Sequence, residues 1–332
     1  MIVVDADFLG RARTGDETYV RNLLRALPRV APDLRFAALT RRPDLVPDGV
    51  EPIHVPARLQ ELRMAVRLPL LLRRLRPQLV HFVHALPPAL PCPGVLTVQD
   101  LSFERDSALM GVRETLTFRL TVRPSVKRAR RVFAISERTR DDLVELYGLR
   151  AEDVVVTPLA ADSAFVPGGG REDYLLLVGS IEPRKRPLVA ADAARSTGRR
   201  LVVAGPARDE ELAAELRRRG AELRGYVPQE ELVRLYQAAA AVLVPTSYEG
   251  FGLTVAEAMA CGAPVVAAPD PAVREVGGDA VAYAEPERFA DVLASVLAEP
   301  AKWSRAALER AHAFSWERTA ERTAAVYREV LA

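Results

Sequence analysis

Residues 244–269, VPTSYEGFGLTVAEAMACGAPVVAAP, decide how the rest of the sequence is interpreted. The apolar segment 240–244 is predicted to be a strand. It leads into a loop containing Gly250 and Gly252, and a helix opens near Leu253. Backbone NH groups at a glycine loop and at a helix start attract anions, above all phosphate. The stretch therefore predicts an anion-binding turn between a strand and a helix.

Two carboxylates, Glu249 and Glu257, flank this turn. Acidic side chains beside a phosphate would repel it, so these two are better suited to accept hydrogen bonds from the hydroxyls of a sugar or ribose. Phosphate and hydroxyls together indicate a nucleotide sugar. The alternative is that both acids are solvated and the glycines only form a turn, because short motifs give false positives.

The composition sets the scale of the protein and narrows its partners. A chain of 332 residues has the length of about two domains, and 49% hydrophobic and 27% charged residues are typical of a globular protein. The net charge of +2 gives no field that would recruit nucleic acid. Cys92 and Cys261 lack metal-ligand spacing, and neither a signal peptide nor an apolar run of spanning length is recognised. We therefore expect a cytoplasmic protein.

Short apolar segments alternate with amphipathic ones along both halves of the chain, which predicts parallel sheets covered by helices. Strands are predicted at 2–4, 35–39, 52–55, 79–83, 94–98, 132–135 and 154–157, and then at 174–178, 201–204, 222–224 and 240–244. Helices are predicted around 19–27, at 113–130, from an N-cap at Ser136 to Tyr147, and at 188–195, 210–219, 229–238 and 316–331.

The sequence around 163–173, with Pro167 followed by three glycines, has the composition of a hinge. We therefore expect an N-terminal Rossmann-like domain at 1–165, a second at 166–315, and a C-terminal helix at 316–332 that can cross back to the first. Ligands of doubly wound sheets bind at the carboxyl ends of the strands, which predicts a site between the two domains.

The stretch 58–76 is rich in leucine and arginine and is predicted to be a helix interrupted at Pro69. One interpretation is a surface helix whose arginines extend along the sheet to water. The other is a peripheral contact with an anionic membrane at its inner face, made through Arg63, Arg67 and Arg73.

Several ordered motifs resemble the retaining glycosyltransferases of family 4, also described as glycosyl transferases group 1, which have the GT-B fold of two facing Rossmann-like domains. The resemblance covers nearly the whole chain. It is carried by the Glu-x7-Glu pair at 249 and 257 with Gly-Phe-Gly between them, and by the segments 262–266, 176–185, 225–227, 134–136 and 314–317, with Thr14, Gly15 and Tyr19.

The resemblance implies roles in binding the donor. Arg184 and Lys185 would neutralise its diphosphate, Glu249 would accept a hydroxyl of the transferred sugar, and Glu257 would accept the ribose hydroxyls. Tyr226 would line the nucleobase pocket, although an aromatic residue at a strand end is as often in the core. The implied donor-binding residues are Gly15, Gly179, Tyr226, Val227, Gly250, Phe251, Gly252, Leu253, Thr254 and Glu257.

The acceptor side departs from the family pattern. Gln99 stands where family members commonly have His, and a glutamine cannot titrate near neutral pH. Asp100 either orients an acceptor hydroxyl or caps the following turn. His81 and His84 lie at the end of a predicted strand, and His84, beyond it, is the better candidate for the site.

The predicted reaction is transfer of a mannose- or glucose-type sugar from a nucleoside diphosphate, GDP or UDP first, to a hydroxyl of a carbohydrate, a lipid-linked or a small-molecule acceptor. The resemblance implies retention at the anomeric carbon. The reaction that the resemblance implies requires no Asp-x-Asp metal site, so no metal or other cofactor is predicted. The alternatives are a nucleotide-sugar-binding protein without transferase activity, and a phosphorylase or epimerase of the same two-domain shape. The sequence does not fix the oligomeric state.

Overall fold

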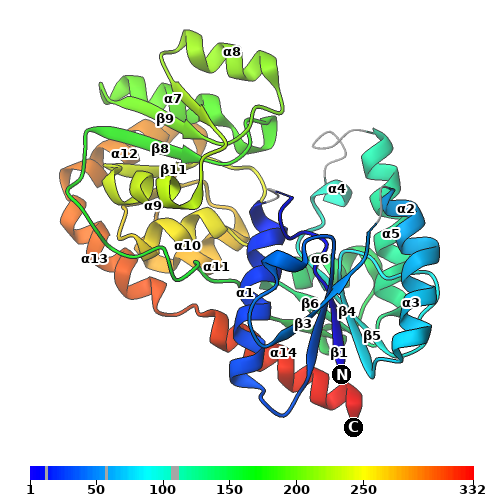
Figure 1. The fold of residues 1–332 in the computed structure, drawn as a ribbon. Coiled ribbons are helices and arrows are strands. Elements are labelled where there is room, and N and C mark those ends of the chain that lie inside the picture. Colours follow the sequence, from blue (N-terminus) through cyan, green and yellow to red (C-terminus); the bar gives the residue numbers. More distant parts are fainter. Residues whose placement is uncertain (12–13, 57–58, 106–111) are drawn as a thin grey trace. The chain divides into compact units, whose positions relative to one another are not determined.

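The computed structural model describes residues 1–11, 14–56, 59–105 and 112–332. The chain divides into two compact units. Unit 1 consists of Met1–Leu159 together with Ser315–Ala332, and unit 2 consists of Ala160–Phe314. The division falls at 159/160, whereas the sequence composition placed it at 165/166. Each unit is built on its own parallel sheet, as predicted (Figure 1).

The sheet of unit 1 has seven strands in the order β3-β2-β1-β4-β5-β6-β7. The strands are β1 (Ile2–Asp5), β2 (Phe36–Thr40), β3 (Val50–His54), β4 (Leu79–Val83), β5 (Gly94–Val98), β6 (Arg131–Ala134) and β7 (Val154–Val156). The chain starts in the middle, moves outward to β3 and then crosses back to β4. The loops after β1 and β4 therefore diverge at the point where ligands of such sheets bind.

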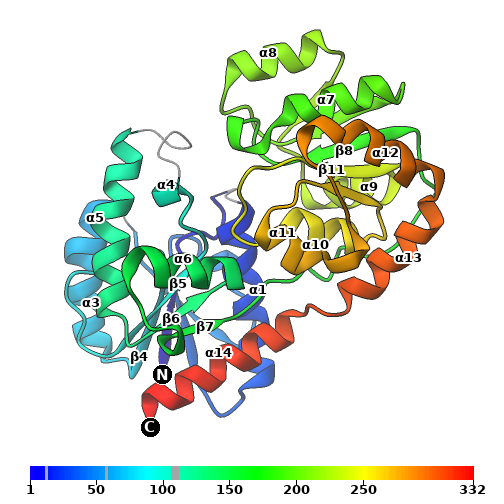
Figure 2. The ribbon, with the colours of Figure 1, turned by 180° about the vertical axis from the view of Figure 1, so that it is seen from behind.

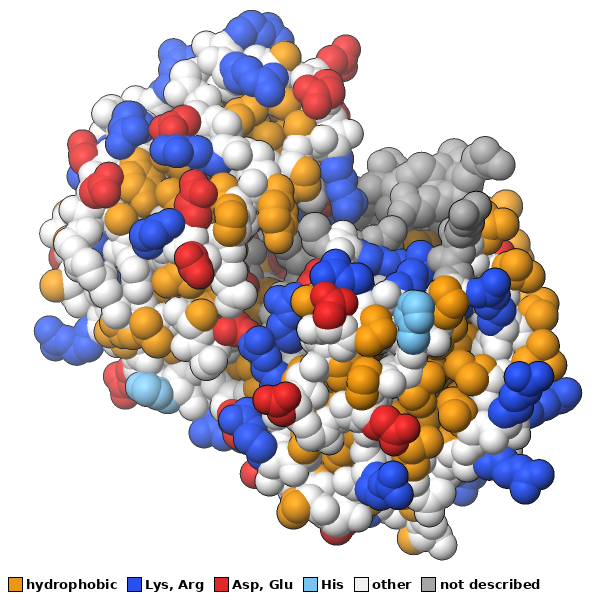
Figure 3. Space-filling model, viewed as in Figure 1, with side chains coloured by type: hydrophobic (Ala, Val, Ile, Leu, Met, Phe, Trp, Pro, Cys, Tyr) orange, Lys and Arg blue, Asp and Glu red, His pale blue; other side chains and the backbone are white. Residues whose placement is uncertain are grey.

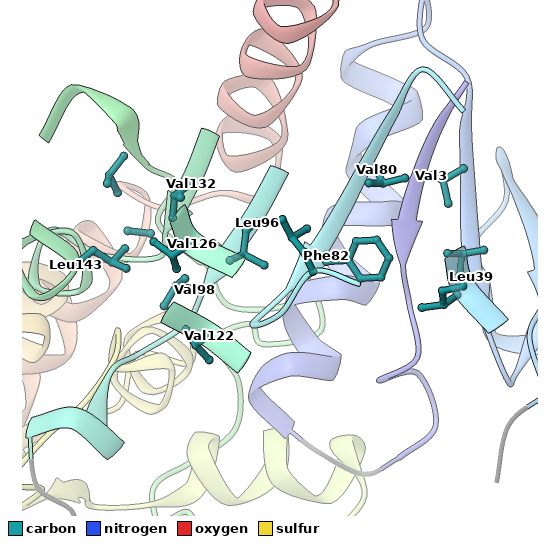
Figure 4. Close-up of a cluster of buried hydrophobic side chains, with 14 of the residues drawn as sticks. Val3, Leu39, Val80, Phe82, Leu96, Val98, Val122, Val126, Val132 and Leu143 are labelled. Atoms are coloured by element: carbon teal, nitrogen blue, oxygen red, sulfur yellow. The ribbon is translucent and has the colours of Figure 1, made fainter. Parts of the chain in front are cut away.

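Helices cover both faces of this sheet. They are α1 (Thr14–Val30), α2 (Gln60–Leu62), α3 (Leu68–Leu75), α4 (Ser102–Arg105), α5 (Val112–Arg128), α6 (Glu137–Tyr147) and α14 (Trp316–Leu331). One apolar cluster joins Val80, Phe82 and Leu96 of the sheet to Leu72 of α3 and Val126 of α5 (Figure 4). The predicted cap of α6 is confirmed, since the Ser136 hydroxyl accepts a hydrogen bond from the backbone NH of Thr139.

The C-terminal helix α14 covers the other face of the same sheet (Figure 2). The Tyr327 ring lies edge-on to His81 and Phe133, at centroid distances of 5.7 and 6.3 Å. Arg328 donates to Asp33 at 2.6 Å, across 295 positions of sequence. The predicted return of this helix to the N-terminal half is thus confirmed, and burial of its apolar face explains it.

The sheet of unit 2 has six strands in the order β10-β9-β8-β11-β12-β13. They are β8 (Tyr174–Val178), β9 (Arg200–Ala204), β10 (Glu222–Gly225), β11 (Ala241–Val244), β12 (Val265–Ala267) and β13 (Ala282–Tyr283). The helices are α7 (Pro187–Ser196), α8 (Glu210–Arg218), α9 (Gln229–Ala238), α10 (Leu253–Ala260), α11 (Pro271–Gly277), α12 (Phe289–Ala298) and α13 (Pro300–Ala311). Here the chain order reverses between β8 and β11.

The arginine-rich stretch differs from its prediction. The helix changes to a π-helical turn at Arg63–Arg67, and Pro69 is instead accommodated in the first turn of α3. Arg63 is fully buried and ion-paired with Asp5 and Asp7. Both interpretations of this stretch placed Arg63 at the surface, one of them in contact with a membrane, and for this residue both are wrong, because its side chain is held inside unit 1. Arg58 lies outside the described residues.

None of the helices in the described ranges is both long enough and apolar enough to cross a bilayer.

Candidate functional site

The carboxyl ends of β8 and β11 bring two loops of unit 2 together. Gly179 follows β8 with φ of +133°, and a β-carbon there would lie 3.4 Å from Cε of Lys185. A β-carbon on Gly205 would lie 2.0 Å from the Gly179 carbonyl oxygen. Only glycine permits this close approach at position 205, and the positive φ favours glycine at position 179, so both glycines fix the path of the loop. The donor-binding role of Gly179 stays a prediction.

The loop after β8 forms a short 3-10 turn, Pro183–Lys185, that is tied to the loop after β11. Arg184 donates to the carbonyl oxygen of Tyr248 at 2.7 Å and to Glu182 at 2.7 Å. In return, the Arg184 carbonyl oxygen accepts the backbone NH of Ser247 at 2.9 Å. The two loops therefore hold one another, and the cations between them are fixed in position.

Glu249 pairs with both predicted diphosphate ligands. Its carboxylate lies 2.5 Å from Nζ of Lys185 and 3.6 Å from Nη1 of Arg184. Burial on its own would raise the pKa of Glu249, but the nearby charges of Lys185 and Arg184 outweigh it, so the pKa is lowered. Sequence reasoning assigned the cations to phosphate and the acid to a sugar, and did not foresee that they contact each other.

The Gly250-Phe251-Gly252 segment forms the entry to α10, as predicted. Gly252 has φ of +98° and stands at the N-cap, and within the described part of the chain no side chain caps this helix. Phe251 is buried edge-on against Phe314, with ring centroids 5.8 Å apart. The α10 start, including Leu253, therefore presents backbone NH groups uncovered by a side-chain cap, a suitable place for anionic oxygens.

Glu257, one turn into α10, is buried and hydrogen-bonded to a tyrosine. Tyr236 of α9 donates to its carboxylate at 2.8 Å, and the Thr254 side chain hydrogen-bonds the same tyrosine. Burial raises the pKa of Glu257 to about 7, the Tyr236 hydrogen bond opposes the shift, and the charge of Asp162 adds to it. The sequence analysis missed Tyr236, although a tyrosine on the apolar side of an amphipathic helix signals that its hydroxyl needs a buried partner.

Tyr226 and Val227 follow β10 at the same edge of the sheet. Tyr226 is 58% exposed, so the alternative that it belongs to the core is wrong. An exposed aromatic ring at a strand end is available for stacking.

In unit 1, Gly15 and Gln99 are neighbours. A β-carbon on Gly15 would lie 4.0 Å from Oε1 of Gln99. Gln99 is 7% exposed, and its Nε2 atom has no hydrogen-bond partner among the residues that the structure describes. An amide buried without a partner is costly, which suits a group that awaits a ligand oxygen.

Asp100 acts as a cap. Its carboxylate accepts the backbone NH of Ser102 at 2.9 Å and the Ser102 hydroxyl at 2.7 Å, at the start of α4. The structure thus contains the capping contact, one of the two alternatives for this residue, and the acceptor role stays a prediction.

The histidine in β4 and the one that follows it have different environments. His81 is fully buried between Thr97 and Tyr327, with its ring nitrogens 2.7 and 2.5 Å from their hydroxyls, and burial lowers its pKa to about 3. His84 follows the strand in a left-handed conformation, φ +67°, and its Nε2 lies 3.0 Å from Asp16 of α1. His81 is therefore a core residue, and His84 lies where the chain order of unit 1 reverses.

In the described ranges no cluster of three His, Cys, Asp or Glu side chains is arranged to hold a metal ion.

Comparison with known sequences identifies relatives in two ways. The family model "Glycosyltransferase Family 4" matches residues 13–165, and "Glycosyl transferases group 1" matches residues 161–313. O-antigen chain mannosyltransferase B of Escherichia coli is 31% identical over 61% of this chain and 62% of its own length. A D-inositol 3-phosphate glycosyltransferase of Kribbella flavida is 38% identical over 61% of this chain and 57% of its own length. These matches span less than two thirds of either relative.

Solved structures share the fold over nearly the full length. Sucrose-phosphate synthase of Thermosynechococcus elongatus has a TM-score of 0.76 at 20% identity, covering 99% of this chain and 98% of its own. Anabaena HepE in complex with UDP and glucose has a TM-score of 0.72 at 16% identity, covering 98% and 99%. These structures show that the chain shares the GT-B fold. Because one family model matches each half of it, the chain belongs to glycosyltransferase family 4, the glycosyl transferases group 1.

Proposed function

We propose that this protein is a retaining glycosyltransferase that moves a mannose- or glucose-type sugar from a nucleoside diphosphate to an acceptor hydroxyl. The observation that carries the proposal is the cluster of Arg184, Lys185 and Glu249 beside the start of α10. It combines two cations, one carboxylate and backbone NH groups without a side-chain cap at the strand ends of one sheet, and Glu257 lies one turn into α10. A diphosphate and a set of hydroxyls would match these groups.

In the proposed reaction, the bond between the anomeric carbon and the diphosphate oxygen breaks, and a bond from that carbon to the acceptor oxygen forms on the same face. The acceptor proton passes to an oxygen of the departing diphosphate. Lys185 and Arg184 would stabilise the charge that develops on that leaving group. Glu249, now paired with both cations, would then share them with the diphosphate and hold a sugar hydroxyl.

The relatives guide the choice of donor. HepE has been solved in complex with UDP-glucose, and the Escherichia coli relative is named a mannosyltransferase. UDP-glucose and GDP-mannose are therefore the first donors to test. Tyr226 and Val227 would contact the base, and Glu257 the ribose.

Substitution of the proposed ligands tests the assignment. Lys185→Ala and Glu257→Ala should each lower donor turnover on the order of 100-fold, because each removes a proposed polar contact to the donor. Lys302→Ala is the matched control, since Lys302 is an exposed lysine of unit 2. Turnover within a few-fold of the parent in either site variant would contradict the proposal.

Proton NMR of the product would test retention of configuration at the anomeric carbon. The proposed reaction uses no metal ion, so full activity in the presence of EDTA is expected.

A nucleotide-sugar-binding protein without turnover is the second candidate. It is favoured by the acceptor side, where Gln99 cannot titrate and Asp100 is engaged by Ser102. Calorimetry that shows donor binding, with no product over a panel of hydroxyl acceptors, would support this candidate instead.

A further inference from the structure

Exposed apolar side chains are concentrated on one part of unit 1. Among the large apolar residues of the described ranges that are most exposed, only Val166 and Tyr226 lie in unit 2. The others expose between 45% and 67% of their surface and lie on or next to α2, the π-helical turn, α3 and α5: Leu59, Leu62, Val66, Leu70, Leu116 and Leu120. Exposed leucines scattered singly need no explanation, but a group of six does.

These side chains belong to one surface. Leu68 and Leu72 of α3 join the same core cluster as Val122 and Val126 of α5, so both helices pack on the same face of the sheet. Figures 1 and 2 show the two helices on that side. Their outward sides therefore point away from the sheet together, and we call the outward side of α2, α3 and α5 the leucine–arginine face.

Along the helices, the face changes from apolar side chains near the helix beginnings to cations in the later turns. Each helix leads to the amino end of the next parallel strand, so it runs opposite to the strands. Leu62 and Leu116, near the helix beginnings, therefore lie toward the carboxyl edge of the sheet, the edge from which Gln99 and His84 follow their strands. The exposed cations of the later turns lie toward the opposite edge: Arg73, Arg74, Arg123, Lys127 and Arg128.

The charged residues of this face are cationic with one exception. Residues 60–76 and 116–130 contain a single acid, Glu61. In Figure 3, apolar and cationic side chains border one another over α2 and α3. A second copy of the chain using the same face would bring arginines against arginines, which is unfavourable. A bilayer with anionic phospholipids matches both features, because apolar side chains enter below the headgroups and guanidinium groups bind phosphate.

We propose that the leucine–arginine face docks this protein on an anionic phospholipid bilayer. Leu62, Val66, Leu70 and Leu120 insert below the headgroups, and the cations of the later turns contact lipid phosphates. Arg63 takes no part, because it is buried on the opposite side of the same turn. The docking goes beyond the proposed transfer reaction and does not depend on it.

Cosedimentation with vesicles tests the proposal. The full-length protein should pellet with phosphatidylcholine vesicles that contain phosphatidylglycerol and remain in solution with phosphatidylcholine alone. Arg73→Gln/Arg74→Gln/Lys127→Gln should weaken partitioning on the order of 100-fold, since each cation near an anionic surface contributes a factor of about five. Leu62→Gln/Leu70→Gln/Leu120→Gln should weaken it roughly 10-fold or more, and added salt should not restore it. The matched control is Arg195→Gln/Arg217→Gln/Arg305→Gln, three exposed arginines of unit 2, which should bind as the parent does.

Three results would overturn the proposal: no pelleting of the parent at low salt, equal pelleting with neutral vesicles, or parental binding by both face variants. Sedimentation velocity tests whether a second copy of the chain occupies the face instead. If the parent is a dimer that does not bind vesicles, and the leucine variant is a monomer, the face is a dimer interface. If the leucine variant does not fold, the cation variant carries the test, as its residues are exposed. Donor binding by every variant, measured by calorimetry, keeps the outcome separate from that of the proposed transfer reaction.

Discussion

Glu257 retains a proton over a pH range in which an exposed glutamate is ionised. Burial raises its pKa to about 7 from 4.5, so between these two values the folded protein binds a proton that the unfolded chain has released. The free energy of unfolding must then fall as pH rises through this window, and level off above about pH 7. The expected loss is up to about 3 kcal/mol.

Glu257→Gln should remove this pH dependence. A glutamine stays neutral and still accepts the Tyr236 hydrogen bond, so the variant should be more stable than the parent above about pH 7 and nearly equal to it below about pH 5. Urea unfolding between those limits measures the slope. Glu287→Gln, at an exposed glutamate of unit 2, is the control. If the free energy of unfolding of the variant depends on pH as that of the parent does, other groups cause the dependence.

Single residues also show what the sequence could reveal of the site. Gly179, Lys185, Glu249 and the Gly-Phe-Gly entry to α10 follow strands, and strand positions can be predicted from apolar runs. The Glu257–Tyr236 contact could not be predicted, because it depends on how α9 packs against α10. The cap made by Asp100 could be predicted as one of two alternatives, because an aspartate side chain commonly hydrogen-bonds the backbone two residues later.

At the scale of elements, the segment from α2 to α3 has an exposed apolar side and a side that buries an ion pair. Its outer side carries exposed leucines, and its inner side buries Arg63 against Asp5 and Asp7 at the end of β1. An arginine in an amphipathic helix predicts solvent exposure, which is why the sequence placed Arg63 at the surface. Asp5 and Asp7, two acids at the end of a buried strand, were the sequence feature that indicated a buried cationic partner.

Arg63→Met should therefore destabilise the protein strongly. The substitution removes the cation that pairs with the buried Asp5, whereas Asp7 keeps its pairs with Arg11 and Arg41. Removal of one partner of a buried ion pair typically costs about 3–5 kcal/mol. Arg73→Gln, an exposed arginine of the same segment, should change stability by less than about 0.5 kcal/mol. Urea unfolding of both variants measures the difference. A similar small effect at both positions would show that Arg63 is not the partner on which these acids depend.

At the scale of the whole molecule, the two tryptophans report on different units. Trp303 lies in α13 against the apolar core of unit 2, and Trp316 is buried in unit 1. If the donor binds to unit 2, a nucleoside-diphosphate sugar at about 100 times its Kd should stabilise that unit by about 2.7 kcal/mol.

Fluorescence-detected urea unfolding tests this with one tryptophan at a time. The donor should shift the transition of Trp316→Phe, which retains Trp303, by more than that of Trp303→Phe. The nucleoside without its diphosphate is the control and should shift both transitions little. A larger shift of the Trp316 signal would place the donor site in unit 1.

The position of α14 sets an order for biosynthesis. Residues 160–314 leave the ribosome between β7 and the helix whose Tyr327 covers His81 and Phe133. Unit 2 is continuous in sequence and can fold as soon as it emerges, whereas the part of the unit 1 sheet that α1 leaves uncovered on this face stays open to water until α14 follows. Unit 1 is therefore the first to be translated and the last to be completed. Its exposed apolar surface is the one that chaperones would have to protect.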